Sequence, residues 1–141
     1  MIERFWNDFC TKNGYDFTYT EAFQFGADAN FLGSLVVEGK KVATTSGLVF
    51  YELDGTKIPE ANEYSIVLNS KNEPIAVIKT TKIEVMPFNE VSEEFALSEG
   101  EGDYEFWHKT HTDFFKQECA SYNIPFKEDM LVVCENFIKV G

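Results

Sequence analysis

The stretch Glu38-Gly39-Lys40-Lys41-Val42-Ala43-Thr44-Thr45-Ser46 lies where a predicted helix ends and a predicted buried strand begins. Gly39 suits the end of the helix, because glycine adopts the left-handed backbone conformation without a steric penalty. The β-branched residues after it favour a strand. This junction places the amine of Lys41 and the hydroxyl of Thr44 three residues apart. If burial disfavours the charged form of Lys41, its neutral amine can take a proton from the Thr44 hydroxyl.

The same residues also have a purely structural interpretation. Lys40 and Lys41 would offset the negative C-terminal end of the preceding helix. Thr44 and Thr45 would be ordinary strand residues, since β-branched side chains are common in strands. The stretch by itself favours this structural interpretation, so a catalytic role needs support from elsewhere in the chain.

The length and composition predict one folded domain covering residues 1–141, with 44% hydrophobic and 16% aromatic residues. No apolar run is long enough to span a membrane, and residues 1–6 lack the basic-then-apolar pattern of a signal peptide. We therefore expect a cytoplasmic protein that does not associate with a membrane. The three cysteines, Cys10, Cys119 and Cys134, are widely spaced, which favours buried reduced thiols over disulfides.

The charge balance limits the class of partner. Twelve basic residues face 24 acidic ones, which gives a formal net charge of -12, and Arg4 is the only arginine. Binding along duplex DNA relies on a basic surface, so duplex DNA is excluded as a partner. A small nucleoside-like ligand or a short single-stranded RNA stays open, because a small site needs only local complementarity.

Hydrophobic periodicity and turn residues divide the chain into helices and strands. Helices are predicted at 2–13, between an Asp28 cap and Gly39, at 48–53, 93–98 and 104–122, strands at 42–46, 63–68, 74–86 and 131–140, and an extended aromatic segment at 15–27. The strands at 63–68 and 74–86 form a hairpin, bulged near 79–82. We expect an α+β fold in which a mostly antiparallel sheet forms a small barrel with flanking helices, and the helix at 2–13 packs on it.

Ionisable residues outside the opening stretch suggest little chemistry by pattern alone. His108 and His111 lie three apart on the long predicted helix, but no Cys-x-x-Cys or His-Glu-x-x-His pattern accompanies them, so we predict no metal and no cofactor. His111, on the apolar stripe, is expected to be a hydrogen-bonded core residue. The segment 88–105 contains seven acidic residues and no basic one, which is typical of a solvated face. Glu99 differs from the others because it ends a short helix before a flexible Gly-Glu-Gly, where it could turn inward toward Lys41.

Taken together, these segments resemble the ASCH domain family, a branch of the PUA-like barrels, and in particular its larger bacterial-type single-domain members. The resemblance covers nearly the whole chain. It is carried by Phe25-Gly26, Gly39 to Thr44, Glu63 to Leu68, Met86 to Val91, Glu99 to Asp103, Trp107 with His111 and Phe114-Phe115, and Val132 to Glu135.

The resemblance implies a PUA-like β-barrel whose cleft receives the lysine of a Gly-x-Lys pattern, here Lys41. One branch of the family hydrolyses the amide of N4-acylated cytidines through a lysine, a threonine and a glutamate, which match Lys41, Thr44 and Glu99 as catalytic residues. The predicted ligand-binding residues are Lys40, Phe25, Tyr51 and Trp107. The implied function is a small hydrolase acting on a nucleoside-like amide.

Two departures from the family pattern keep alternatives open. The long helix after Trp107 and the first helix enlarge the domain beyond the compact amidohydrolases, so the cleft could suit another ligand and turnover stays undecided. Another branch is described as a ribonuclease, but the acidic surface opposes the approach of RNA. The alternatives are therefore a non-catalytic module for a nucleotide or single-stranded RNA, a ribonuclease, or a protein-interaction domain, such as a homodimer, whose acidic segment 88–105 engages a basic partner.

Overall fold

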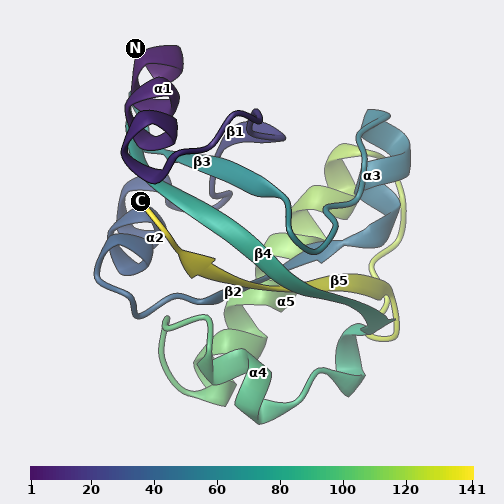
Figure 1. The fold of residues 1–141 in the computed structure, drawn as a ribbon. Helices are drawn as coiled ribbons and strands as arrows, with labels where there is room; N and C mark the ends of the chain where they lie inside the picture. Colours follow the sequence, from purple (N-terminus) through teal and green to yellow (C-terminus); the bar gives the residue numbers. More distant parts are fainter.

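The computed structural model describes residues 1–141 and contains one five-stranded sheet with helices around it (Figure 1). In chain order the elements are α1 (Ile2–Asn13), β1 (Glu21–Gln24), α2 (Ala29–Val37), β2 (Ala43–Gly47), α3 (Leu48–Asp54), β3 (Tyr64–Leu68), β4 (Pro74–Pro87), the 3-10 helix η1 (Phe88–Glu90), α4 (Glu93–Leu97), α5 (Tyr104–Ser121) and β5 (Leu131–Lys139). None of the helices is both long enough and apolar enough to cross a membrane.

The strand order of the sheet is β1-β3-β4-β5-β2, so β1 and β2 are its two edges. β1 pairs with β3 in parallel, and the other three pairings are antiparallel. The predicted hairpin is β3–β4, and the register of β4 against β5 shifts between Thr80 and Lys82, where a bulge was predicted. The sheet curls strongly into a half-barrel, which confirms the α+β, PUA-like fold (Figure 1).

Local sequence signals set most element boundaries. Asp28 caps α2 by accepting from the backbone N–H of Phe31, and Ser92 caps α4 in the same way. Gly39, with φ 77°, follows α2 in the left-handed conformation. The predicted extended segment 15–27 is wrong in length, because only Glu21–Gln24 joins the sheet.

The residues before β1 pack by their side chains instead of forming a strand. Tyr15 and Phe17 lie against Tyr64, with ring centroids 5.8 and 4.8 Å from it. The aromatic residues that suggested a strand are therefore held by side-chain packing, and the backbone there forms no hydrogen-bonded strand pairing.

Helix α5 packs its apolar face against β5 of the sheet. Its buried side chains are Trp107, His111, Phe115 and Cys119. Trp107, Phe115 and Cys119 pack in one core cluster with Phe88 and with Val132 and Cys134 of β5, whereas α2 packs in a second cluster with β3, β4 and Phe137. The cysteines are unpaired, and Cys119 and Cys134 are buried, as predicted, while Cys10 is half-buried.

The loop after α4 crosses the junction between α2 and β2. The backbone N–H of Val42 donates to the carbonyl of Ser98 at 2.9 Å. Gly100, with φ 76°, lies so close to this junction that a Cβ atom on it would be 2.4 Å from the carbonyl oxygen of Lys40. The predicted flexible break is therefore a tightly packed loop at this glycine, and it fixes Glu99 beside Lys41.

Substituting Gly100 tests this close approach, and Gly39 provides a matched control because both glycines have φ near 77° but no atom lies within 4 Å of a Cβ built on Gly39. We expect Gly39→Ala to lower the free energy of unfolding by about 1 kcal/mol, the backbone penalty alone. Gly100→Ala should lower it by about 3 kcal/mol, because the steric overlap adds to that penalty. Urea unfolding measures both values, and equal losses would show that the loop does not press on the junction.

Candidate functional site

Lys41 is buried at the end of the α2–β2 connection, with 1% of its side chain exposed. Its Nζ atom donates to the carbonyl oxygen of Ala43 at 2.8 Å and to Oε1 of Glu99 at 3.0 Å. The same atom lies 5.2 Å from the centroid of the Phe25 ring. A buried ammonium needs such partners, because an unpaired charge is costly to remove from water.

Glu99 is the centre of the buried polar network and is also 1% exposed. Its Oε2 atom accepts from Thr45 Oγ1 at 2.7 Å and from Trp107 Nε1 at 2.6 Å. His111 Nε2 lies 3.4 Å from the same oxygen. Residues from the α2–β2 connection, β2 and α5 therefore converge on one carboxylate, which the loop after α4 carries.

The charge state of Glu99 follows from these contacts. Burial alone would raise the pKa of its carboxyl group, but the charge of Lys41 and the contacts with His111 and Thr45 outweigh burial and lower the pKa to about 2. Glu99 is consequently a carboxylate at neutral pH, paired with a cation.

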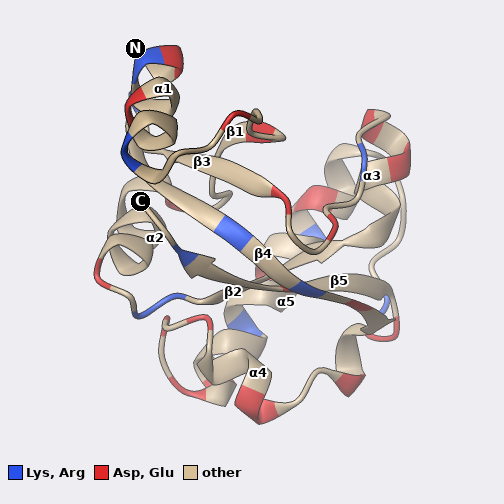
Figure 2. Ribbon diagram, in the orientation of Figure 1, with Lys and Arg blue, Asp and Glu red and all other residues tan.

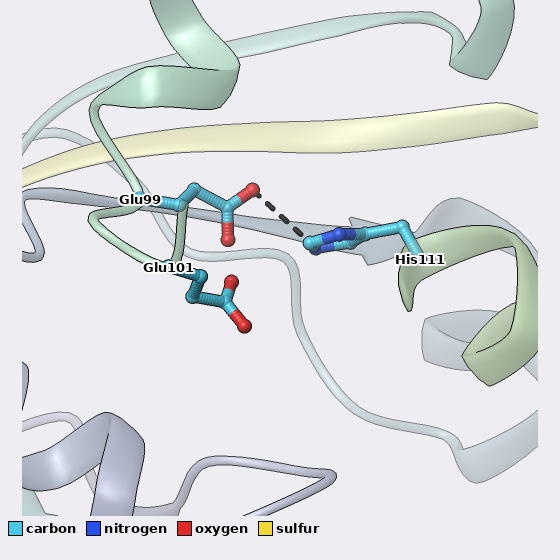
Figure 3. A group of neighbouring side chains, drawn as sticks. All are labelled: Glu99, Glu101 and His111. Atoms are coloured by element: carbon cyan, nitrogen blue, oxygen red, sulfur yellow. Dashed lines mark ion pairs between the residues drawn. The ribbon is translucent and has the colours of Figure 1, made fainter. Parts of the chain in front are cut away.

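His111 and Glu101 face the same carboxylate (Figure 3). Burial lowers the pKa of His111, but the hydrogen bond and charge of Glu99 and the contact with the Trp107 carbonyl raise it overall. Burial raises the pKa of Glu101, and the charge of Lys41 offsets only part of that effect. His111 is a hydrogen-bonded core residue, as predicted, and it also belongs to the ionisable network.

Glu99, Glu101 and His111 each bring one potential ligand atom to within 4.8 Å of the others. Both oxygens of Glu99 already accept hydrogen bonds from protein donors. A metal ion at this place would also lie close to the ammonium of Lys41. The donor set therefore does not fit a metal ion.

Two adjoining cavities lie beside this network. The smaller, about 60 Å³, is lined by Phe25, Gly26, Ala27, Leu32, Lys41, Thr44, Thr45, Glu99, Glu101, Thr110, His111 and Phe114. The larger, about 270 Å³, extends from β1 to β2, the two unpaired edges of the curled sheet, and then along α3 and α5. The two cavities share Phe25, Gly26, Thr44, Thr45 and Phe114.

The lining of the larger cavity is aromatic and acidic. Aromatic side chains come from Phe23, Phe25, Phe50, Tyr51 and Phe114, and carboxylates come from Glu21, Asp54, Glu118 and Glu135. No lysine, arginine or histidine lines it. The acidic residues seen along many elements in Figure 2 thus continue into the cleft.

The structure brings the three predicted catalytic residues to one cavity, but it does not join them all by hydrogen bonds. Lys41 and Glu99 form the ion pair, whereas the hydroxyl that binds Glu99 belongs to Thr45. Thr44 is half-buried where the two cavities meet, and its side chain makes no hydrogen bond with Lys41. Since β2 is an edge strand, both threonines line both cavities although neighbouring side chains in a strand point to opposite faces.

The predicted ligand-binding residues divide into two groups. Phe25 lines both cavities and Tyr51 lines the larger one. Lys40 is at the surface, where its Nζ pairs with Glu38 at 3.2 Å, and Trp107 is in the core, where it holds Glu99. These last two side chains line neither cavity.

Sequence reasoning missed Thr45 and Glu101 as members of the site. Thr45 was visible only as a second hydroxyl beside Thr44, and Glu101 only as one acidic residue among seven in 88–105. Their positions depend on the strand register and on the path of the Gly100 loop, for which the chain carries no local signal.

Glu99→Gln tests the energetics of the network, and Glu38→Gln is its control because the Lys40–Glu38 pair is at least half exposed. At neutral pH we expect Glu99→Gln to lower the free energy of unfolding by about 3 kcal/mol, since it leaves the charge of Lys41 buried and unpaired. Glu38→Gln should change it by no more than about 0.5 kcal/mol. Chemical denaturation compares the variants, and similar small losses would contradict a tightly coupled buried pair.

The low pKa of Glu99, about 2 against an ordinary 4.5, also sets a pH dependence. A carboxyl group whose pKa is lower in the folded than in the unfolded protein stabilises the fold at pH values above its unfolded-state pKa. This contribution is lost as the pH falls toward the folded-state pKa. The stability difference between wild type and Glu99→Gln should therefore shrink as the pH falls from about 5 to about 2. Thermal melts across this range measure it, and a constant difference would show that Glu99 is not the titrating group.

Comparison with known proteins identifies the family of this chain. The ASCH domain family model matches residues 21–141. A comparison with curated proteins found no match.

Three solved structures resemble the chain. The crystal structure of a DUF984-family protein from Enterococcus faecalis V583 has a TM-score of 0.89 and 42% identity, and the match covers 98% of this chain and 86% of that chain. An ASCH domain from Lactobacillus crispatus JV V101 has a TM-score of 0.85 and 34% identity, with 98% and 90% covered. The hypothetical protein PH0355, at 17% identity, a TM-score of 0.54 and 85% and 96% coverage, shares the fold alone. On this evidence the chain belongs to the ASCH domain family.

Proposed function

We propose that this protein is a small hydrolase acting on a nucleoside-like amide of the N4-acylcytidine type. Thr44 is the nucleophile, Lys41 is the base when neutral, and Glu99 positions the lysine amine. The observation that carries the proposal is that these three residues line one small cavity, which adjoins a larger aromatic cleft at Thr44.

The sizes of the two cavities fit the two parts of such a substrate. A cavity of about 60 Å³ is too small for a nucleoside but suits a short acyl group such as acetyl. The cleft of about 270 Å³ offers the faces or edges of Phe23 and Tyr51 to a base. An amide that joins the two parts would then have its carbonyl carbon near Thr44, which lines both cavities.

Accessibility favours Thr44 over Thr45 as the nucleophile. Thr45 is buried and its hydroxyl donates to Glu99, whereas Thr44 is half-buried and free of such a bond. Catalytic hydrogen bonds commonly tighten only once substrate is bound, so the missing Thr44–Lys41 bond in the free protein is compatible with the assignment.

The steps follow from these positions. Lys41 can act as a base only as a neutral amine, so it must first release a proton to solvent. The neutral amine then takes the hydroxyl proton of Thr44 as the Thr44 oxygen bonds to the carbonyl carbon. The C–N bond breaks, the amine departs with a proton, and water hydrolyses the resulting Thr44 ester to regenerate the hydroxyl.

The charge of the cleft favours a nucleoside over a phosphorylated ligand or RNA. Four carboxylates and no cationic side chain line the larger cavity, and Lys41 is occupied by Glu99. A phosphate group would therefore meet negative charge without a partner. For the non-catalytic RNA-binding and ribonuclease alternatives, the cleft offers aromatic side chains for stacking on bases but no cationic side chain for the RNA phosphates.

The test is incubation of the purified protein with N4-acetylcytidine and with its 5′-monophosphate, following free cytidine or its monophosphate by chromatography. We expect release from the nucleoside and at least about 10-fold less from the monophosphate, because the cleft repels the added charge. Thr44→Val should reduce release by at least about 100-fold. Thr81→Val, an exposed strand threonine away from both cavities, is the control.

Lys41→Ala should also abolish release, but it leaves Glu99 unpaired in the core, so its unfolding curve must be measured in parallel. Failure of wild-type protein to release cytidine from any acylated nucleoside would contradict the proposed function. Tighter binding of the monophosphate than of the nucleoside would favour the nucleotide-binding alternative.

A further inference from the structure

The smaller cavity contains an uneven set of charges. Lys41, Glu99, Glu101 and His111 line it. If both glutamates were ionised and His111 were neutral, this set, in which Glu101 is half-buried and the other three residues are buried, would have one uncompensated negative charge. Because an unpaired charge in a poorly solvated place is costly, the set favours one further proton.

Two groups can hold this proton. Glu99 cannot, since its pKa is about 2, and the Cys134 thiol beside it stays protonated because burial and the charge of Glu99 raise its pKa to about 12. His111 and Glu101 remain, and their surroundings raise the pKa of each. Their candidate atoms lie within 4.8 Å of each other and of Glu99.

The backbone selects the ring nitrogen that exchanges the proton. His111 Nδ1 lies 2.9 Å from the carbonyl oxygen of Trp107, which can only accept, so Nδ1 donates. The second proton therefore binds at Nε2, which faces Glu99 at 3.4 Å (Figure 3). His111 also lines the smaller cavity. The charged groups around His111 are Glu99, Glu101 and, beyond Glu99, Lys41.

We propose that His111 is the catalytic acid that protonates the departing nitrogen of the amide, and that Glu101 is a positioning residue that keeps the imidazolium charged. This role rests on the proposed function. As the C–N bond breaks, its electron pair takes the Nε2 proton and the amine leaves neutral. The neutral His111 then accepts a proton from the water that attacks the Thr44 ester. As the ester C–O bond breaks, Lys41 returns its proton to the Thr44 oxygen and the carboxylic acid is released. One water is consumed, and His111 is again an imidazolium.

The first test measures the proton directly. The chain has two histidines, so NMR titration resolves both, and His108→Gln assigns the signals. We expect the His111 pKa above 6.5, and Glu101→Gln should lower it, since it removes the neighbouring negative charge. Glu105→Gln, an exposed carboxylate on the first turn of the same helix, should leave it unchanged. A value at or below 6.5, or one insensitive to Glu101→Gln, would overturn the inference.

The second test separates an acid from a structural residue. His111→Gln should lower kcat for N4-acetylcytidine by about 100-fold with KM unchanged, because an amine cannot leave without a proton. The first-turnover release of nitrophenolate from p-nitrophenyl acetate, measured above the Thr44→Val background, should slow by less than about threefold, since this phase reports formation of the Thr44 ester alone and nitrophenolate leaves unprotonated. A loss in this phase equal to the loss of kcat on N4-acetylcytidine would overturn the role of His111.

The two failures are distinguishable. A wild-type protein that releases no cytidine removes the proposed function and the acid role that rests on it. The NMR titration is independent of turnover, and it still decides whether His111 and Glu101 share the extra proton.

Discussion

The buried ion pair between Lys41 and Glu99 is the interaction on which the arrangement of this site depends. Each side chain is 1% exposed, so neither charge can be satisfied by bulk water. Glu99 is held by donors from Thr45 and Trp107 as well as by Lys41, and it thereby ties β2, α5 and the loop after α4 to one carboxylate. Buried ion pairs contribute little net stability compared with apolar packing, so such a network beside a cavity points to chemistry.

The fold supports this pair through backbone contacts that a charge alone could not make. Lys41 lies in the connection between α2 and β2, just after Gly39 turns the chain, and the backbone N–H of Val42 donates to the carbonyl of Ser98 on the opposing loop. Gly100 allows the two backbones to approach within the space that a side chain would fill. A change of backbone conformation at Gly39 or Gly100 would therefore alter the distance between the charges of Lys41 and Glu99. The electrostatics of the cavity thus depend on the close packing of these two backbones.

What the sequence predicted well was local. The cap at Asp28, the turn at Gly39, the hairpin between β3 and β4 and the stripe of α5 depend on residues close together in the chain, and the structure confirms them. The family followed from several such segments in order. The extended segment at 15–27 was mostly wrong because side-chain packing against Tyr64, not strand pairing, holds its aromatic residues.

The site was predictable mainly through the family resemblance. Lys41 and Glu99 were chosen because they match the lysine and the glutamate of the family pattern, and in the structure they form an ion pair. Choosing between Thr44 and Thr45, or separating Glu101 from six other acidic residues, required the register of an edge strand and the path of one loop. The same tertiary path explains an apparent contradiction in charge. A protein of net charge -12 with an acidic cleft nevertheless brings its one deeply buried lysine, with His111, against Glu99. Of the two cavities, only the smaller one is therefore lined by a lysine and a histidine, and both lie against Glu99.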